Sequence, residues 1–301
     1  MLSWLPADAG SSSLRHVGLT KAQLLETLVK DHSETILRHY SAANLTQRIA
    51  AVVNSVVPEN RPATAKDLAP IDQFHTRGLA ATADLAKLAG VERDMLVLDV
   101  GCGLGGPARY LAETFGCTVL GIDLSPDFVD AATYLTKRSL VDRTRFLVGD
   151  AFNMPASDGT VDLVWMQHVA MNIAERDRLY LEIHRVLRRG GRLALFDVVE
   201  RSGDIHFPVP WSRTADTSFL LSAEQTRDVL SATGFTILEW RDDTVLAREW
   251  FKELSATPPT PGTPSLGVVM GPDFPELIRN LALNLAEGRV GILSAVLERR
   301  A

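Results

Sequence analysis

A glycine-rich loop beside an acid is the most informative stretch of this 301-residue chain. The segment LDVGCGLGGPARYLA begins at Leu98 and sets Asp99 two residues before the first of four glycines. Glycines at a strand-to-helix turn permit positive φ and let a ligand approach the backbone closely, and the following helix offers free N–H groups. Such a loop suits a dinucleotide or another nucleotide-like cofactor. A carboxylate would repel a pyrophosphate, so Asp99 favours a ligand with a cationic group.

Two further acids end the next two expected strands. Asp123 ends TVLGID, and Asp150 ends RFLVGD. A carboxylate about 20 residues beyond a glycine loop can bind both hydroxyls of a ribose, and one at the next strand end can accept a hydrogen bond from an adenine amino group. Ligands of open α/β sheets lie across the carboxyl ends of the strands. The loop and the acids therefore predict a ligand with an ammonium group, a ribose and a base.

An alternation of strands and helices from Met95 onward must position these residues. The expected strands are MLVLDV, TVLGID, RFLVGD, VDLVWM and GRLALFDVV, with helices such as PARYLAETFG and PDFVDAATYLTKR between them. Strands that alternate with helices of this length form βαβ units around a buried parallel sheet. FTILEW and GILSAVLERR extend the sheet, and a helical insert precedes the last strand.

Helices and a linker are expected before the sheet. Thr20 can cap a helix from Lys21 to about Arg38, and a second helix is expected over residues 43–56. The segment 57–70 has the composition of a linker. We therefore expect an N-terminal helical lid segment over residues 1–73 and a core domain over residues 74–301. Insertions at about 203–220 and 245–289 are expected to cover the acceptor side.

The combined motifs identify a family resemblance. DVGCGLGG, then GID, then GDA resembles the class I S-adenosylmethionine-dependent methyltransferases, over roughly residues 74–240. The resemblance implies a Rossmann-like seven-stranded sheet with its last strand antiparallel, and S-adenosylmethionine as the cofactor. It places the methionine moiety at the glycine loop, the ribose at the second acid and the adenine at the third. The implied cofactor-binding residues are Gly78, Asp99, Gly101, Gly103, Gly105, Asp123, Leu124, Asp150, Ala151 and Gln167. We expect Gln167 to contact the cofactor through its backbone.

Three side chains are candidates for the chemistry of methyl transfer. His168 follows the fourth expected strand, near the sulfonium, where a histidine that titrates near neutrality suits an amine or hydroxyl acceptor. His75 precedes a helix that touches the cofactor's carboxylate end in related enzymes, and it is either a lid residue or a local helix cap. Tyr40 would close over the cofactor, as an N-terminal tyrosine does in related enzymes, or lie on an amphipathic helix face. We rank His168 first.

The acceptor pocket is expected after the fifth strand, in and beyond HFPVPW. Arg213 would anchor a carboxylate or phosphate, whereas Phe207 and Trp211 would help to build an apolar pocket for a ring or prenyl chain. The chain most resembles the branch with glycine/sarcosine/dimethylglycine, phosphoethanolamine, tocopherol and ubiquinone/menaquinone methyltransferases. We predict N-methylation of a small amine or amino acid. The alternative is O- or C-methylation of a phenolic, quinol or prenylated metabolite.

Charge and composition argue against other classes of protein. A net charge of −6 without a basic stripe disfavours nucleic-acid binding, and no run reaches the ~18 apolar residues of a membrane span. The N-terminus lacks the pattern of a secretory signal, and two cysteines predict neither a disulfide framework nor a metal site. We expect a metal-free cytoplasmic enzyme whose first helix and late insert are candidate faces for a homodimer. A cyclase that binds the cofactor without methylating is the other enzyme class considered, and Asp99 disfavours an NAD-dependent oxidoreductase.

Overall fold

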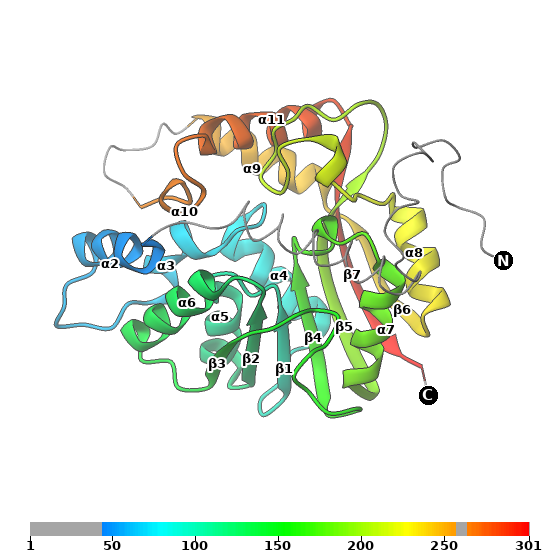
Figure 1. Cartoon of the computed structure of the whole chain (residues 1–301), viewed down its shortest axis with the longest axis horizontal. Coiled ribbons are helices and arrows are strands. Elements are labelled where there is room, and N and C mark those ends of the chain that lie inside the picture. The colour runs from blue at the N-terminus through cyan, green and yellow to red at the C-terminus, as the bar shows by residue number, and fades with distance from the viewer. Residues whose placement is uncertain (1–43, 257–263, 301) are drawn as a thin grey trace, which may run out of the picture. The chain divides into compact units, whose positions relative to one another are not determined.

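A seven-stranded mixed sheet forms the centre of the computed structural model, which describes residues 44–256 and 264–300 (Figure 1). The strand order is β3-β2-β1-β4-β5-β7-β6. Strands β1 to β5 pair in parallel, and β7 runs antiparallel to both β5 and β6, which confirms the expected topology. The strands are β1 (Leu96–Val100), β2 (Thr118–Asp123), β3 (Thr144–Val148), β4 (Val161–Gln167), β5 (Leu187–Glu200), β6 (Phe235–Asp242) and β7 (Val290–Arg299).

Helices cover both faces of this sheet (Figure 1). One core cluster joins the first face to α4, α5, α6, α9 and α11, and a second joins the other face to α7 and α8. The described helices are α2 (Leu45–Val56), α3 (Ala65–Asp72), α4 (Gly78–Ala89), α5 (Gly106–Phe115), α6 (Pro126–Ser139), α7 (Arg176–Val186), α8 (Ala223–Ala232), α9 (Thr244–Ala256), α10 (Gly267–Met270) and α11 (Phe274–Ala286).

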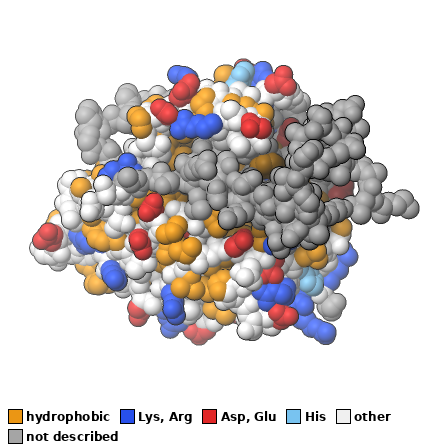
Figure 2. Space-filling view, in the orientation of Figure 1, with side chains coloured by type: hydrophobic (Ala, Val, Ile, Leu, Met, Phe, Trp, Pro, Cys, Tyr) orange, Lys and Arg blue, Asp and Glu red, His pale blue; other side chains and the backbone are white. Residues whose placement is uncertain are grey.

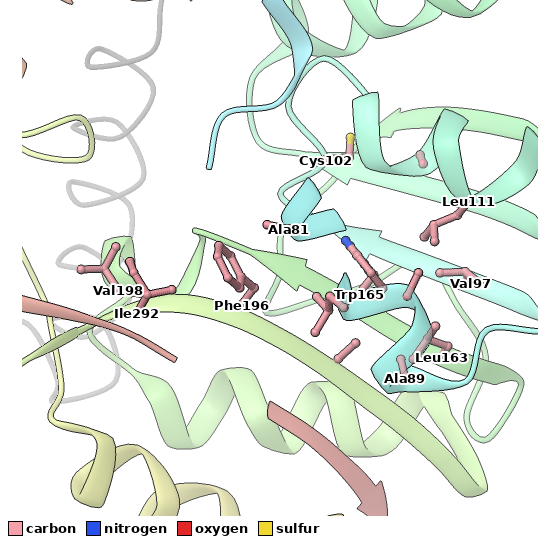
Figure 3. Close-up of a cluster of buried hydrophobic side chains, with 14 of the residues drawn as sticks. Ala81, Ala89, Val97, Cys102, Leu111, Leu163, Trp165, Phe196, Val198 and Ile292 are labelled. Atoms are coloured by element: carbon pink, nitrogen blue, oxygen red, sulfur yellow. The ribbon is translucent and has the colours of Figure 1, made fainter. Parts of the chain in front are cut away.

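Alternating side chains along the central strands pack into the two hydrophobic clusters, one on each face of the sheet. In β1, Val97 belongs to the first core cluster and Leu98 to the second, as the two-residue period of a strand requires. Trp165 on β4 and Phe196 on β5 are large, fully buried members of the first cluster (Figure 3). The strands read as apolar runs because both faces are buried. Asp99 shares the face of Val97, which brings a carboxyl group into this apolar layer.

The expected linker at residues 57–70 was wrong in its second half, where the chain forms α3. Thr64 and Asp67 make a capping box: the Asp67 N–H donates to Thr64 Oγ1, and the Thr64 N–H donates to the Asp67 carboxylate. This reciprocal pair satisfies backbone donors that would otherwise lack partners at the helix start. Pro70 lies inside the short helix. The prolines thus masked a helix start that the Thr-x-x-Asp spacing could have revealed.

Helix α2 packs on the sheet domain through a third cluster. Leu45, Ile49 and Val53 lie along one face of α2 and contact α6 residues that include Phe128 and Leu135. Residues 45–72 therefore share a packed core with α6. The expected helix at residues 21–38 lies outside the described residues, and the lid role of residues 1–73 stays a prediction.

A segment after β5 is tied to the helical insert. We call residues 203–211 the strap. Asn284 on α11 accepts from the His206 N–H at 2.9 Å and donates to the His206 carbonyl at 3.0 Å, and Asn280 donates to the Pro208 carbonyl at 2.9 Å. Both asparagines are buried, so these bonds satisfy polar groups that burial removes from water. The strap and α11 thus form one unit although they are far apart in sequence.

The face shown in Figure 2 mixes basic and acidic side chains among hydrophobic ones. Within residues 44–256 and 264–300, no helix is both long and apolar enough to cross a membrane. In the same described part of the chain, no group of three or more His, Cys, Asp or Glu side chains is arranged to hold a metal ion.

Candidate functional site

The glycine-rich loop lies between β1 and α5, at the carboxyl edge of the sheet. Gly101, Gly103 and Gly105 have φ of 67°, 52° and 75°, backbone conformations that favour glycine. The N–H of Cys102 donates to the Ile122 carbonyl at 3.0 Å, which anchors the loop to β2. The loop is therefore held in one shape by its neighbour strand.

Space as well as backbone conformation explains two of these glycines. A Cβ on Gly101 would lie 2.5 Å from Val169 Cγ2, and one on Gly105 would lie 2.4 Å from Phe146 Cζ. Gly105 therefore serves the packing of α5 over the sheet, and its predicted contact with the cofactor stays a prediction. A Cβ on Gly103 would meet Phe74 only at an ordinary 3.7 Å, so backbone conformation alone favours glycine there.

Asp123 at the end of β2 is fixed by backbone donors. Its Oδ2 accepts from the Gly103 N–H and its Oδ1 from the Ser125 N–H, both at 2.9 Å. Burial raises the pKa of this half-buried carboxyl, while those backbone hydrogen bonds act in the opposite direction. Each carboxylate oxygen has a further lone pair, so the group can still accept from a pair of hydroxyls. Leu124 follows it and is half-buried.

Asp150 and Ala151 lie just beyond β3, which pairs with β2. Asp150 Oδ1 accepts from the Phe152 N–H at 2.8 Å, which holds the turn after the strand. Both Asp150 and Ala151 are half-buried. Because β1, β2 and β3 are consecutive neighbours in the sheet, Asp99, Asp123 and Asp150 lie in that order along one edge. This is the order that the sequence predicts for an ammonium group, a ribose and a base.

A small cavity lies over the start of the glycine loop. It is bounded by the α3–α4 connection, the end of β1, the loop and the end of β4. Its lining residues are Asp72, Phe74, His75, Asp99, Gly101, Cys102, Gly103, Pro107 and Gln167. The sequence-predicted residues Asp99, Gly101, Gly103, Gln167 and His75 thus come together here.

Four buried polar atoms of this lining lack a hydrogen-bond partner among the described residues: Asp72 Oδ1, His75 Nδ1, Asp99 Oδ2 and Gln167 Nε2. We call them the open cavity atoms. Most buried polar atoms in proteins have partners, so four open ones around one cavity point to a polar ligand. Two are carboxylate acceptors and one is an amide donor. The set fits the amino acid end of S-adenosylmethionine, which carries an ammonium and a carboxylate.

Asp99 is a buried carboxyl group whose charged form is disfavoured. The residue is 2% exposed. Burial raises the pKa of its carboxyl well above the ordinary value, and the nearby charge of Asp123 raises it further. A cationic ligand opposes both effects, since an opposite charge favours the ionised carboxylate. Asp99 is therefore suited to an ammonium group.

Gln167 contributes its side chain to the cavity, whereas the sequence favoured a backbone contact. Its Oε1 accepts from Trp165 Nε1 at 2.9 Å. An indole N–H can only donate, so the amide oxygen must face Trp165, and the amide nitrogen is left without a partner among the described residues. Whether the Gln167 backbone also contacts cofactor stays a prediction.

His168 follows β4 with a φ of 54°. Its ring stacks on Phe196, with centroids 5.4 Å apart and planes inclined by 7°. Burial lowers the pKa of His168 well below 6.5, and the nearby His75 lowers it further. The ring is thus neutral near pH 7, as a base must be, but His168 is not one of the residues that line the cavity.

His75 does line the cavity, and its ring centroid lies 6.1 Å from that of His168. Burial lowers the pKa of His75 to about 4. In the described structure α4 has no side-chain cap, so the helix-cap alternative does not apply to the His75 ring. The Gly78 N–H, at the start of α4, donates to the His75 carbonyl at 3.3 Å. Gly78 therefore helps to shape the turn that presents His75.

The predicted acceptor residues do not meet at this cavity. Arg213 is exposed and forms an ion pair with Asp273 at 2.8 Å. Trp211 is buried, and its Nε1 donates to Ser218 Oγ at 2.9 Å, so it serves as packing of the strap. Phe207 is half-buried against the first core cluster. Their contact with an acceptor stays a prediction, and Tyr40 lies outside the described residues.

The sequence reasoning missed a buried ion pair behind the cavity. Arg109 on α5 donates to Asp72 Oδ2 at 2.8 Å, and both side chains are almost fully buried. Burial raises the pKa of the Asp72 carboxyl and the Arg109 charge opposes that rise. An arginine on the buried stripe of an amphipathic helix needs a partner, which was the available signal. The pair leaves Asp72 Oδ1 as an open cavity atom.

Comparisons with known proteins agree with this site. Residues 98–195 match the family model described as a methyltransferase domain. The sterol 24-C-methyltransferase of Kluyveromyces lactis is 31% identical over 166 residues, which cover 52% of this chain and 45% of that relative. The sarcosine/dimethylglycine N-methyltransferase of Halorhodospira halochloris is 36% identical over 135 residues, covering 44% and 48%. The chain thus spans about half the length of these curated relatives.

Solved structures show the same fold over most of the chain. The cyclase SpnF superposes with a TM-score of 0.63 at 24% identity, covering 89% of this chain and 97% of that one. The geranyl diphosphate C-methyltransferase of Streptomyces coelicolor A3(2) gives a TM-score of 0.65 at 17% identity, with the same coverage. That structure holds S-adenosyl-L-homocysteine. With the glycine loop and the ordered acids, residues 98–195 therefore carry a methyltransferase domain, and the described chain has the fold of the solved methyltransferase.

Proposed function

We propose that this chain transfers the methyl group of S-adenosylmethionine to a small-molecule acceptor. The observation that carries the proposal is the set of open cavity atoms: buried carboxylate, amide and imidazole atoms without hydrogen-bond partners, on residues that line one cavity at the glycine loop. A protein that bound no ligand there would leave those polar groups buried at a cost of about 1–3 kcal/mol each. The matched methyltransferase domain and the ordered acids support the same cofactor.

Three of the four open cavity atoms have a counterpart on the cofactor. Asp99 and Asp72 accept from the ammonium group, and the Gln167 amide donates to the carboxylate. Asp123 accepts from the ribose hydroxyls with lone pairs that Gly103 and Ser125 do not use. Asp150 and Ala151 meet the adenine. Fixing both ends of the cofactor aligns its methyl group, and alignment supplies much of the rate acceleration in a displacement reaction.

Methyl transfer to an N–H, O–H or C–H acceptor also requires a base to accept one proton. When bound, S-adenosylmethionine would supply the methyl carbon, and its sulfur would keep the electron pair of the broken C–S bond. The acceptor supplies the electron pair of the new bond, from a lone pair on nitrogen or oxygen or from a π bond at carbon. An N–H, O–H or C–H acceptor also loses a proton. His75 faces the cavity as a neutral imidazole because burial lowers its pKa to about 4. His168, first in the sequence ranking, stacks on Phe196 next to it. We assign the base to His75 and leave His168 as the second candidate.

The acceptor is best described as uncharged and largely apolar, with a hydroxyl or a reactive carbon. The guanidinium that an amino acid acceptor would need, Arg213, is engaged by Asp273 at the surface. Aromatic rings lie by the cavity: Phe74 lines it, and Phe196 packs against both histidine rings. Relatives named for sterol and tocopherol methylation match as well as the sarcosine/dimethylglycine enzyme does. N-methylation of a small amine, which the sequence favours, is the second candidate.

The test is the release of S-adenosylhomocysteine with a panel of acceptors: phenols, quinols, prenylated substrates, sarcosine and phosphoethanolamine. We expect turnover with the ring or prenyl substrates, and the same kcat/KM in Arg213→Ala. Turnover restricted to sarcosine or phosphoethanolamine, with a raised KM in Arg213→Ala, would establish the second candidate instead. Consumption of an acceptor without S-adenosylhomocysteine would refute methyl transfer and favour a cyclase.

A further inference from the structure

A fully buried hydroxyl connects three side chains around the cavity. Thr82, on α4, is 0% exposed. Its Oγ1 lies 2.8 Å from Gln73 Oε1, 3.0 Å from His75 Nε2 and 3.3 Å from Gln167 Oε1. Methyl transfer as proposed above uses His75 and Gln167 but gives Thr82 no role.

The orientations of the two amides follow from their other partners. Trp165 Nε1 donates to Gln167 Oε1 at 2.9 Å, so the oxygen of that amide faces Thr82 as well. The Gln73 side chain hydrogen-bonds to the carboxyl of Asp72. Because Asp72 is ion-paired with Arg109, it accepts that bond and the Gln73 NH₂ group donates it. The oxygen of Gln73 is then left to face Thr82, so both amides present acceptors to the hydroxyl.

A count of protons now fixes the state of His75. The Thr82 hydroxyl has one proton, and two amide oxygens compete for it, with Gln73 Oε1 at the shorter distance. If Thr82 donated to His75 instead, both oxygens would face a hydroxyl lone pair without a proton between them. The bond between Thr82 and His75 must therefore take its proton from His75 Nε2.

We propose that Thr82 is a positioning residue that holds His75 as its Nε2–H tautomer, so that the lone pair of Nδ1 faces the cofactor cavity. In neutral imidazole the bond made by one nitrogen decides which nitrogen is the acceptor. His75 Nδ1 is an open cavity atom, and Phe196 meets the ring edge-on with centroids 5.8 Å apart, which limits its rotation. Among the described residues, the His168 ring lies next to the His75 ring, and the charge of Arg77 lowers the pKa of His75.

The tautomer is a property of the protein alone, and only its use as a proton acceptor rests on the proposed function. The test therefore has two readouts. The ¹⁵N chemical shifts of His75, in protein labelled at its histidine rings, report which nitrogen holds the proton, and the His75→Asn spectrum assigns the signals. Steady-state kinetics reports the base.

Thr82→Val removes the hydroxyl at nearly constant volume, and Thr82→Ser keeps it. We expect the Nε2–H pattern in wild type and Thr82→Ser, and its loss in Thr82→Val. We also expect Thr82→Val to lower kcat at least about tenfold, as a wrongly protonated histidine lowers catalysis, with a change below about twofold in KM for the cofactor. Thr82→Ser should recover most of kcat.

Thr226→Val is the matched control. Thr226 is a buried threonine on α8 whose Oγ1 donates to the Ser222 carbonyl at 2.8 Å, away from the cavity. It should leave the His75 shifts and kcat unchanged. An Nδ1–H pattern in wild type, or an Nε2–H pattern that survives in Thr82→Val, would overturn the inference. The expected shifts without any methyl transfer would instead uphold the tautomer and refute the proposed function.

Discussion

Replacing Asp99 by asparagine should strengthen the fold and weaken cofactor binding at once. The carboxyl is 2% exposed, its Oδ2 is an open cavity atom, and the charge of Asp123 is near. An ionised carboxylate without a partner is costly to bury, and a neutral amide of the same shape costs less. The opposite signs of the two effects make the prediction sharp.

The magnitudes follow from the bonds gained and lost. A hydrogen bond to a charged group is worth about 1.5–3 kcal/mol, so Asp99→Asn should raise the Kd for S-adenosylmethionine about 10- to 150-fold. Relief of the unpaired carboxylate should return about 1–3 kcal/mol to the ligand-free fold, which is about 2–4 °C in Tm per kcal/mol for a domain of this size. Isothermal titration calorimetry measures the first effect and thermal unfolding the second.

The pH dependence provides an independent check. Because the pKa of Asp99 is raised in the folded protein, the folded state holds this proton more tightly than the unfolded chain. The stability of the ligand-free protein should then fall as pH rises above about 4, the unfolded value, until the raised folded pKa is passed. Asp99→Asn should lack this part of the decrease in stability with rising pH.

Asp228→Asn, an exposed position on α8, controls for the loss of one negative charge. It should change neither Kd nor Tm. The reasoning about Asp99 is refuted if Asp99→Asn binds the cofactor as tightly as wild type, or if its ligand-free form melts at a lower temperature than wild type.

The remaining predictions test separate parts of the structure. Gly101→Ala should destabilise the protein by about 1–3 kcal/mol, because its Cβ would lie 2.5 Å from Val169; in denaturant unfolding, Val169→Ala should recover part of that loss, and strict additivity would contradict the clash. Arg213→Ala removes an exposed ion pair and should change the unfolding free energy by about 1 kcal/mol or less. Trp211→Ala should lower the unfolding free energy by about 3–5 kcal/mol, because it removes a buried ring. Equal losses in the two variants would contradict the burial of Trp211. His75 has a pKa lowered to about 4, so its contribution to stability should be present above pH 6.5 and lost as pH falls toward 4. A wild-type minus His75→Gln difference in Tm that is flat over this range would show that the ring is not buried and neutral.

The glycine loop and the three acids could be predicted because their geometry is local. A strand end, a run of glycines with positive φ and a carboxylate at the next strand end each occupy a few consecutive residues, and their order in sequence becomes their order along the sheet edge. The antiparallel last strand came with the family resemblance. Packing glycines were harder to separate, since the contact of Gly105 with Phe146 joins α5 to β3.

The polar network behind the cavity could not be predicted in this way. Thr82, Gln73 and Trp165 are residue types that occur in any core, and they come from α4, the α3–α4 connection and β4. Only tertiary packing brings their polar atoms within hydrogen-bond distance. The ion pair of Arg213 could not be predicted for a related reason: its partner Asp273 is 60 positions away, and a loop sequence carries no signal for such a pair.

The hydrogen bonds from Asn280 and Asn284 to the strap determine which segments can be exchanged between related proteins without damage to the fold. The methyltransferase model ends at residue 195, before the strap and the insert begin. Two stretches separated by most of the last third of the chain are joined through main-chain atoms at His206 and Pro208. Recombination that imported either stretch alone would leave the side-chain amides of Asn280 and Asn284 buried without hydrogen-bond partners. The strap and α11 should therefore be inherited, and exchanged in engineering, together, while the domain that carries the glycine loop is kept.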